Sequence, residues 1–179
     1  MADDQQHDQG TPALWAPWRM KYLEGTRAPE PGCFFCSAVA DPEADRRTYT
    51  LIRGRRAFVI LNKYPYTNGH LMVAPQGHLG KLEEMDDQTL LELMQLTRDC
   101  QVILSEVMRP DGFNIGINVG RAAGAGVPGH LHIHIVPRWA GDANFMTAVA
   151  GMRIIPESLE DTHAKLSAAA DRLGLRVRG

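Results

Sequence analysis

Apolar and polar residues along the chain are arranged in several short runs of the kind that form strands. The runs are bounded by residues that favour turns, such as Arg53-Gly54-Arg55-Arg56 between the first two. Short apolar runs with such boundaries are typical of strands, and a short turn-prone connection is typical of a hairpin. The pattern therefore predicts strands at 49–52, 57–61, 70–74, 113–119 and 130–137.

A longer periodicity follows the third of these runs and predicts a helix over 87–108. Its apolar residues recur at helical spacing, which places them on one face: Leu93, Leu96, Cys100, Ile103 and Val107. Asp86 or Asp87 can cap its start, and Pro110 lies beyond its end. A second helix is expected at 157–173. Because the strands cluster in hairpins without regular strand–helix–strand alternation, we expect an α+β fold around an antiparallel sheet.

The remaining stretches carry weaker structural signals. Residues 1–13 are polar and rich in Asp, Gln and Gly, and we expect a disordered tail there, followed by one domain over 14–179. The segment LWAPWRMKYLEG at 14–25 is expected to pack its aromatic residues on the domain or on a partner subunit, with direct ligand contact as the less favoured alternative. Residues 26–48, rich in Pro, Gly, Asp and Arg, are expected to form a loop.

Composition and charge narrow the function classes. The chain has 179 residues, is 44% hydrophobic and 22% charged, and has a formal net charge of −2. This charge argues against a broad basic surface for nucleic acid, although a few local groups could still hold a small phosphate-bearing ligand. No apolar run reaches the roughly 20 residues that cross a bilayer, and the N-terminal residues lack the pattern of a signal peptide. We therefore expect a cytoplasmic protein without membrane association.

Histidines at alternate positions are the most informative feature of the sequence. His130, His132 and His134 share one face of the predicted strand, while Leu131 and the isoleucines beside them point to the other face. With His at 7 of 179 residues, such alternation is improbable by chance. A row of imidazoles needs polar partners. The row is either a solvated polar face, a metal site or a histidine nucleophile with supporting imidazoles.

The segment HLHIHIV matches the His-φ-His-φ-His-φ-φ signature, in which φ is apolar, of the histidine-triad family of nucleotide hydrolases and transferases. The chain also resembles this family in N-x-x-P-x-x-x-G-H-L at 62–71 and V-x-P-x-x-H at 73–78. Near the start, WAPWRM, and after the triad, PRWAGDANF, resemble the branch that contains bacterial diadenosine-tetraphosphate phosphorylases and related hydrolases. The resemblance implies a five-stranded antiparallel sheet with flanking helices, and a homodimer.

The resemblance also implies roles for individual residues. His132 matches the nucleophile, whose neutral imidazole attacks the α-phosphorus and forms a nucleotidyl-histidine. Its other ring nitrogen should donate to an acceptor that fixes the tautomer. His134 and His70 are expected beside the phosphates as hydrogen-bond donors. A magnesium ion could accompany the substrate phosphates, but no carboxylate cluster in the sequence demands a fixed catalytic metal.

Further positions match the family's nucleotide-binding residues. Asn62 is expected to bind the ribose hydroxyls, Ile60 to cover the adenine, and Asn118 to lie on the phosphate side. The sequence departs from the family at Gly126, where many dinucleoside-polyphosphate hydrolases carry a phosphate-binding glutamine. A glycine there implies a roomier pocket with space for inorganic phosphate as the acceptor.

A structural zinc site is also implied. Cys33 and Cys36 form a C-x-x-C that resembles the one in zinc-containing triad proteins, whose remaining ligands match His78 and His130. Two cysteines and two histidines form a closed tetrahedral set, typical of structural zinc. Alone, the C-x-x-C could also be redox-active or simply packed. Cys100 is expected to be a small buried hydrophobe.

These features lead to one principal hypothesis and its alternatives. We expect phosphorolysis of diadenosine tetraphosphate to ATP and ADP through an adenylyl-histidine, with inorganic phosphate as the acceptor. Hydrolysis of dinucleoside polyphosphates or adenosine phosphoramidates is the runner-up. A nucleotide-binding protein with negligible turnover is a more remote alternative, and a zinc-dependent nucleic-acid binder fits poorly with the charge. His7, in the polar tail, and His163, on the second helix, are expected to be uninvolved.

Overall fold

The computed structural model describes residues 32–142 and 157–175. The expected tail at 1–13, the tryptophan-containing segment at 14–25 and the end of the PRWAGDANF motif lie outside these residues. Within them, no helix has both the length and the apolar character that a bilayer crossing requires.

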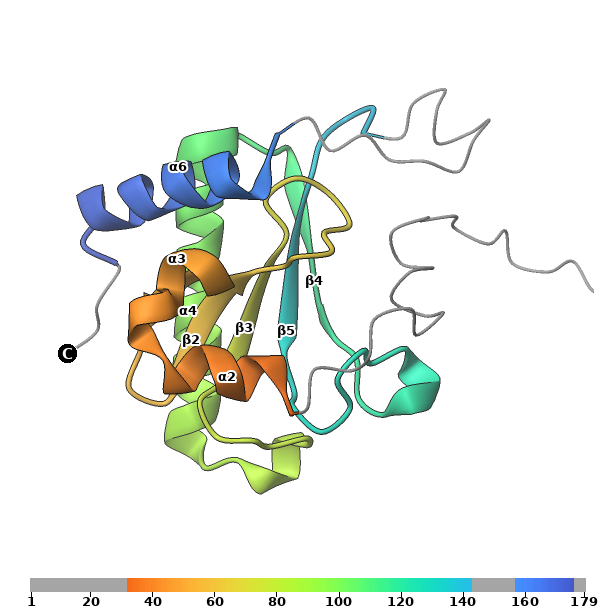
Figure 1. Ribbon diagram of the computed structural model, residues 1–179. Helices are drawn as coiled ribbons and strands as arrows, with labels where there is room; N and C mark the ends of the chain where they lie inside the picture. The colour runs from red at the N-terminus through yellow and green to blue at the C-terminus, as the bar shows by residue number, and fades with distance from the viewer. Residues whose placement is uncertain (1–31, 143–156, 176–179) are drawn as a thin grey trace, which may run out of the picture.

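A single five-stranded sheet organises the described residues (Figure 1). Its order is β1-β2-β3-β5-β4, and each neighbouring pair is antiparallel. The strands are β1 (Thr50–Arg53), β2 (Ala57–Leu61), β3 (Leu71–Pro75), β4 (Gly112–Ile117) and β5 (Ile133–Arg138). The expected α+β fold with an antiparallel five-stranded sheet is thus confirmed, and the bounds of β2 match the prediction.

Two helices cover one face of the sheet. They are α4 (Asp87–Met108), whose bounds match the prediction, and the shorter α6 (Leu159–Arg172). Asp86 caps α4 by accepting a hydrogen bond from the Thr89 backbone N–H. The apolar face predicted for α4 packs on side chains from β2, β3 and β5, and Cys100 is fully buried there as expected.

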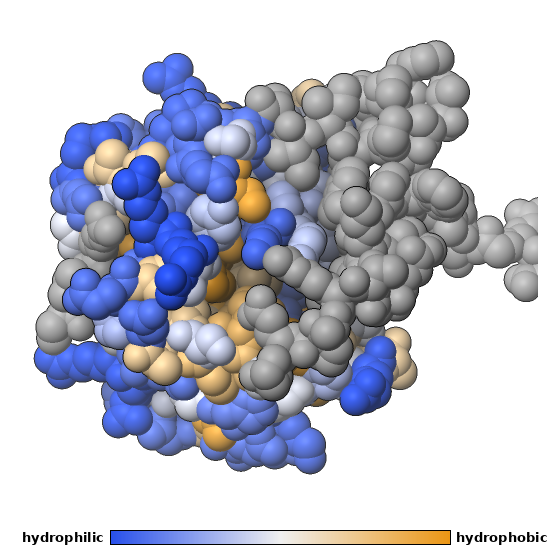
Figure 2. Space-filling model, in the orientation of Figure 1, coloured by the Kyte–Doolittle hydropathy of each residue, from blue (hydrophilic) through white to orange (hydrophobic). Residues whose placement is uncertain are grey.

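The opposite face of the sheet is covered by α2 (Phe34–Ala40), which η1 (Pro42–Ala44) and α3 (Asp45–Thr48) follow. The prediction of a loop over 26–48 was therefore wrong for these residues. The apolar residues of α2 form a second core with side chains of β2 and β3, and the members are Phe35, Ala38, Phe58, Ile60, Met72 and Ala74. Figure 2 shows apolar residues gathered in this region of a mainly hydrophilic surface.

A side chain from β1 stabilises the end of this short helix. The guanidinium of Arg53 donates to the carbonyl oxygens of Ala38 and Val39, at 2.5 and 3.2 Å, and pairs with the Asp45 carboxylate. The last carbonyl groups of a helix have no partner within the helix, so these hydrogen bonds compensate for the termination of α2. The partner is distant in sequence, which explains why local composition did not indicate the helix.

The strand that was expected to carry the whole triad begins later than predicted. β5 starts at Ile133, so His130 and His132 lie in the segment that precedes it, and only His134 lies on the strand. The cause is a different backbone partner, because the Leu131 N–H donates to the Leu79 carbonyl oxygen, at 2.7 Å, outside the sheet. Two further short helices, η2 (Leu82–Glu84) and η3 (Arg121–Ala123), lie in connecting segments.

Candidate active site and metal centre

The proposed nucleophile is held by its own chain. His132 is 5% exposed, and its Nδ1 lies 2.9 Å from the carbonyl oxygen of His130. A carbonyl oxygen can only accept, so Nδ1 carries the proton and Nε2 keeps a lone pair. Burial lowers the pKa of His132, although the hydrogen bond to His130 opposes the shift. The imidazole is therefore held neutral, with a lone pair on Nε2.

His70 and His134 form a second pair of imidazoles. The Tyr66 N–H donates to Nδ1 of His70 at 3.1 Å, and Nε2 of His70 lies 3.0 Å from Nδ1 of His134. Since Nδ1 of His70 accepts, its proton is on Nε2, which donates to His134. The rings of His134 and His132 then meet edge to face, with centroids 4.7 Å apart. Four histidine positions singled out in the sequence thus lie in one cluster, with His130 as the fourth.

His70, which is expected beside the phosphates, is buried within this cluster. Its side chain is 0% exposed, and the two ring nitrogens face Tyr66 and His134. In this arrangement the ring of His70 is hydrogen-bonded to that of His134.

The other expected nucleotide-binding residues lie on or beside β2 and β4 and in the segment before the triad. Asn62 follows β2, where its Oδ1 accepts from the Tyr64 N–H at 2.9 Å and its Nδ2 lies 3.2 Å from Nδ1 of His70. Ile60 is 3% exposed in the core beneath α2, so it offers little free surface to a base. Asn118 directly follows β4, whose last residue, Ile117, pairs with Ile133. Gly126 is exposed in the segment that leads to the triad.

Aromatic residues that the sequence analysis did not single out contact the imidazoles. The ring of Phe35 lies 4.9 Å from that of His130 and 5.0 Å from that of His132. Tyr66 contacts His70 and His134 in the same way. Phe35 lies within the C-x-x-C and Tyr66 lies three residues before Gly69-His70, and neither position indicates a ring contact.

The implied metal ligands also come together. The sulfur of Cys33 lies 3.3 Å from Nδ1 of His130, and the sulfur of Cys36 lies 3.3 Å from Nδ1 of His78 and 3.6 Å from Nδ1 of His130. The four ligand atoms lie within 4.8 Å of one another. Around a tetrahedral zinc ion, sulfur and nitrogen ligands are separated by about 3.6 Å, so this set fits zinc.

The metal centre and the triad share His130. Its Nε2 lies 2.8 Å from the carbonyl oxygen of Pro75, which requires a proton on Nε2 and leaves the lone pair of Nδ1 for the metal. The same residue provides the carbonyl oxygen that orients His132. A metal bound here would therefore connect the segment containing α2 to the triad.

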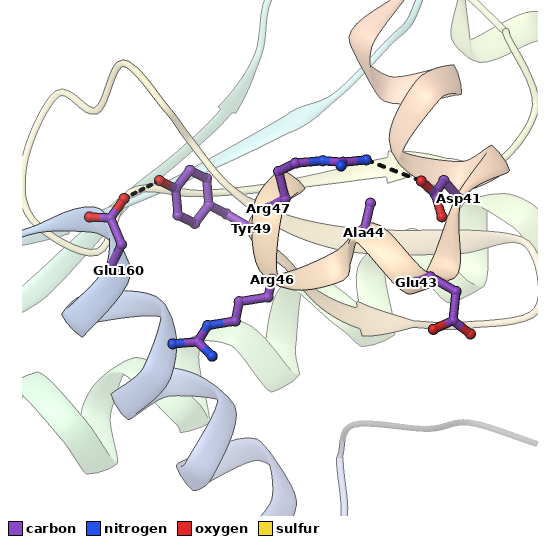
Figure 3. Close-up of a pocket in the computed structure, with 7 residues that line it drawn as sticks. All are labelled: Asp41, Glu43, Ala44, Arg46, Arg47, Tyr49 and Glu160. Atoms are coloured by element: carbon purple, nitrogen blue, oxygen red, sulfur yellow. Dashed lines mark hydrogen bonds and ion pairs between the residues drawn. The ribbon is translucent and has the colours of Figure 1, made fainter.

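A separate hollow lies between α3 and α6, away from the histidine cluster (Figure 3). It is lined by residues of both charges, and the Tyr49 hydroxyl donates to Glu160 across it at 2.5 Å. Nearby, His163 is buried and lies 2.9 Å from the carbonyl oxygen of Thr50. These contacts join α6 to the rest of the domain, so His163 has a packing role.

The chain is similar to proteins of one known family. The family model described as HIT domain matches residues 44–141. The chain belongs to the HIT, or histidine-triad, family. It is 40% identical over 159 residues to an AP-4-A phosphorylase of Mycobacterium tuberculosis, which covers 86% of this chain and 82% of the relative.

Two further relatives illustrate the range of the family. A Zn-bound histidine triad family protein from Mycobacterium smegmatis superimposes with a TM-score of 0.65 at 30% identity, over 80% of this chain and 96% of that one. An asymmetrical bis(5'-nucleosyl)-tetraphosphatase of Schizosaccharomyces pombe is 33% identical over 90 residues, which is 50% of this chain and 49% of the relative.

Proposed function

We propose that this HIT enzyme is a nucleotidyltransferase that cleaves diadenosine tetraphosphate by phosphorolysis to ATP and ADP. The observation that carries the proposal is the state of His132, whose Nδ1 proton is held by the His130 carbonyl while Nε2 keeps its lone pair. The similarity to the mycobacterial AP-4-A phosphorylase over most of both chains supports this substrate.

The proposed reaction has two displacements at one phosphorus atom. Nε2 of His132 attacks the α-phosphorus, the bond from that phosphorus to the bridging oxygen breaks, and ATP leaves. The remaining adenylyl group is bonded to His132. An oxygen of inorganic phosphate then attacks the same phosphorus, the phosphorus–nitrogen bond breaks, and ADP leaves with His132 neutral again. His134, with its proton on Nε2, donates to the phosphate oxygens as negative charge builds up.

The binding roles are proposed on the same basis. Asn118 directly follows Ile117, which pairs with Ile133, and would hydrogen-bond the phosphate groups. Asn62 would exchange part of its present hydrogen bonding for the ribose, and Ile60 would contribute to the apolar floor of the adenine site. The exposed backbone at Gly126 would leave room for inorganic phosphate. Magnesium would accompany the polyphosphate of the substrate.

We propose that Cys33, Cys36, His78 and His130 bind one structural zinc ion. The fit of their ligand atoms and the similarity to a Zn-bound relative support this assignment. When bound, zinc would supply a rigid connection between α2 and the triad. The thiol ligands are compatible with a reducing compartment, and we propose a cytoplasmic location.

We also propose a homodimer built on β4 and α4. β4 lies at the edge of the sheet, and an edge strand offers backbone groups that can pair with a second chain. Large apolar residues are exposed on these two elements: Leu91, Met94, Val102 and Ile115. Exposed apolar residues of this kind are often covered at interfaces. Sedimentation velocity at micromolar concentration should give the mass of two chains, and a monomer there would contradict the proposal.

The acceptor is tested by product analysis. The purified protein is incubated with diadenosine tetraphosphate, with and without inorganic phosphate, and the nucleotides are separated. We expect equal amounts of ATP and ADP with phosphate, and slow formation of AMP and ATP without it. Equal rates and AMP in both reactions would instead indicate a hydrolase. Turnover no higher than that of His132→Ala would indicate a nucleotide-binding protein.

A further inference from the structure

Tyr66 contacts both histidines of the pair behind the nucleophile. Its ring centroid lies 4.6 Å from that of His70 and 5.8 Å from that of His134, and the second contact is stacked at an interplanar angle of 28°. The backbone N–H of the same residue donates to Nδ1 of His70 at 3.1 Å. Tyr66 therefore contacts His70 through its backbone and its ring, and also packs against His134.

As long as the imidazole of His70 keeps its present orientation, the backbone hydrogen bond determines where the protons of this pair lie. An Nδ1 proton on His70 would face the Tyr66 N–H, which is also a donor. His70 therefore carries its proton on Nε2 and donates it to Nδ1 of His134, at 3.0 Å. Because Nδ1 of His134 accepts, the neutral ring of His134 can donate only from Nε2.

The neighbouring strand places little restraint on the His134 ring. Gly116 lies opposite His134 in the β4–β5 ladder, and a Cβ built on this glycine would meet no atom within 4 Å. The ring of His134 contacts those of His70, His132 and Tyr66. Tyr66 differs from the two histidines because it has no assigned part in the chemistry.

We propose that Tyr66 is a positioning residue, which holds His70 and His134 in the one orientation and tautomer that lets His134 donate from Nε2 to a substrate phosphate oxygen. The phosphate part of this inference rests on the proposed function. The hydrogen-bonded order of Tyr66, His70 and His134 rests only on the geometry. The flat ring of Tyr66 restricts rotation of both imidazoles by packing against their faces.

Kinetics of three variants test the role of the ring. Tyr66→Phe keeps the ring, Tyr66→Ala removes it, and Tyr66→Leu removes it but keeps apolar bulk in case the alanine variant fails to fold. We expect Tyr66→Phe to retain the wild-type kcat, and the other two to lose about 10- to 100-fold in kcat, as for a misaligned transition-state donor. Their KM should change much less, since a donor to developing charge acts mainly in the transition state.

Tyr49→Ala is the matched control. Tyr49 also packs on a histidine ring, that of His163 at 5.9 Å, but at the opposite side of the sheet. It should lower thermal stability and leave kcat unchanged. Loss of kcat in Tyr66→Phe equal to that in Tyr66→Leu would overturn the proposal, because the hydroxyl group and not the ring would then matter.

A readout without substrate separates this proposal from the proposed function. Long-range proton–nitrogen NMR spectra identify which ring nitrogen of His134 is protonated, with the signals assigned by a His134→Gln variant. We expect the Nε2–H form in the wild type, in Tyr66→Phe and in Tyr49→Ala, and a mixture of forms in Tyr66→Leu. The Nε2–H form retained in Tyr66→Leu would overturn the positioning role, even if the enzyme cleaves diadenosine tetraphosphate. If the wild type shows no cleavage, the spectra still decide the role of Tyr66.

Discussion

At His132, removal of one imidazole should abolish turnover without unfolding the domain. The side chain lies at the edge of the core, and its hydrogen bond is to the backbone of His130. We expect His132→Ala to lower kcat by at least about 1,000-fold, because no other residue can form the covalent intermediate. Steady-state kinetics with the phosphate-dependent assay measure this. A variant that keeps more than a tenth of wild-type turnover would contradict the covalent role.

A substitution of Gly126 tests whether this residue selects the acceptor. A glutamine at this exposed position should fill acceptor space and place an amide beside the phosphates. We expect Gly126→Gln to reduce the phosphate-dependent formation of ADP and to increase the share of AMP. The ratio of ADP to AMP at fixed phosphate concentration measures the effect. An unchanged ratio would show that this position does not select the acceptor.

Among the elements, α2 depends on a contact from another part of the chain. Arg53 connects the last carbonyl groups of α2 to Asp45, and its side chain is 23% exposed. Arg53→Ala should lower the free energy of unfolding by about 2 kcal/mol, since buried acceptors lose their donor. For a chain of this size this corresponds to about 4–8 °C in Tm.

Arg47 provides the matched control for this element. It pairs with Asp41, but its side chain is 80% exposed. An exposed ion pair contributes little to stability, so Arg47→Ala should leave Tm nearly unchanged. Thermal denaturation measures both variants. An equal decrease in Tm in the two would show that the contact of Arg53 with α2 stabilises the protein no more than an exposed ion pair does.

For the whole molecule, the metal centre joins segments that are distant in sequence. Protein purified without chelators should contain about one zinc per chain, and Cys33→Ser combined with Cys36→Ser should release it. Since binding of a structural metal contributes to folding, chelators and the double variant should both lower Tm. Elemental analysis and thermal denaturation measure these effects.

The third cysteine is the control for the metal. Cys100 is buried in α4, distant in sequence from the other two, so Cys100→Ala should lower stability but keep the zinc. Zinc absent from the wild type, or lost equally in Cys100→Ala, would contradict the assigned ligands.

Local pattern alone determined much of the architecture. The bounds of β2 and α4 follow from their apolar residues. A helix with one buried face has apolar residues at helical spacing, and a fully buried strand is a short continuous apolar run. Both patterns can be recognised without knowing which element covers them. The sequence also indicated the histidines of the triad and the set of two cysteines and two histidines. Metal ligation and nucleophilic attack need the sulfur and nitrogen atoms that these residue types carry. The family, with its five-stranded sheet, followed from the same short motifs.

Tertiary structure alone decided which atoms meet. α2 was missed because its stabilising donor, Arg53, and its apolar partners lie on other elements. The late start of β5 depends on the bond between Leu131 and Leu79, and the burial of His70 depends on its contacts with Tyr66 and His134. The proton positions of the imidazoles depend likewise on carbonyl and N–H groups whose places local sequence does not encode. Such contacts join residues that folding brings together, so no short-range pattern could indicate them.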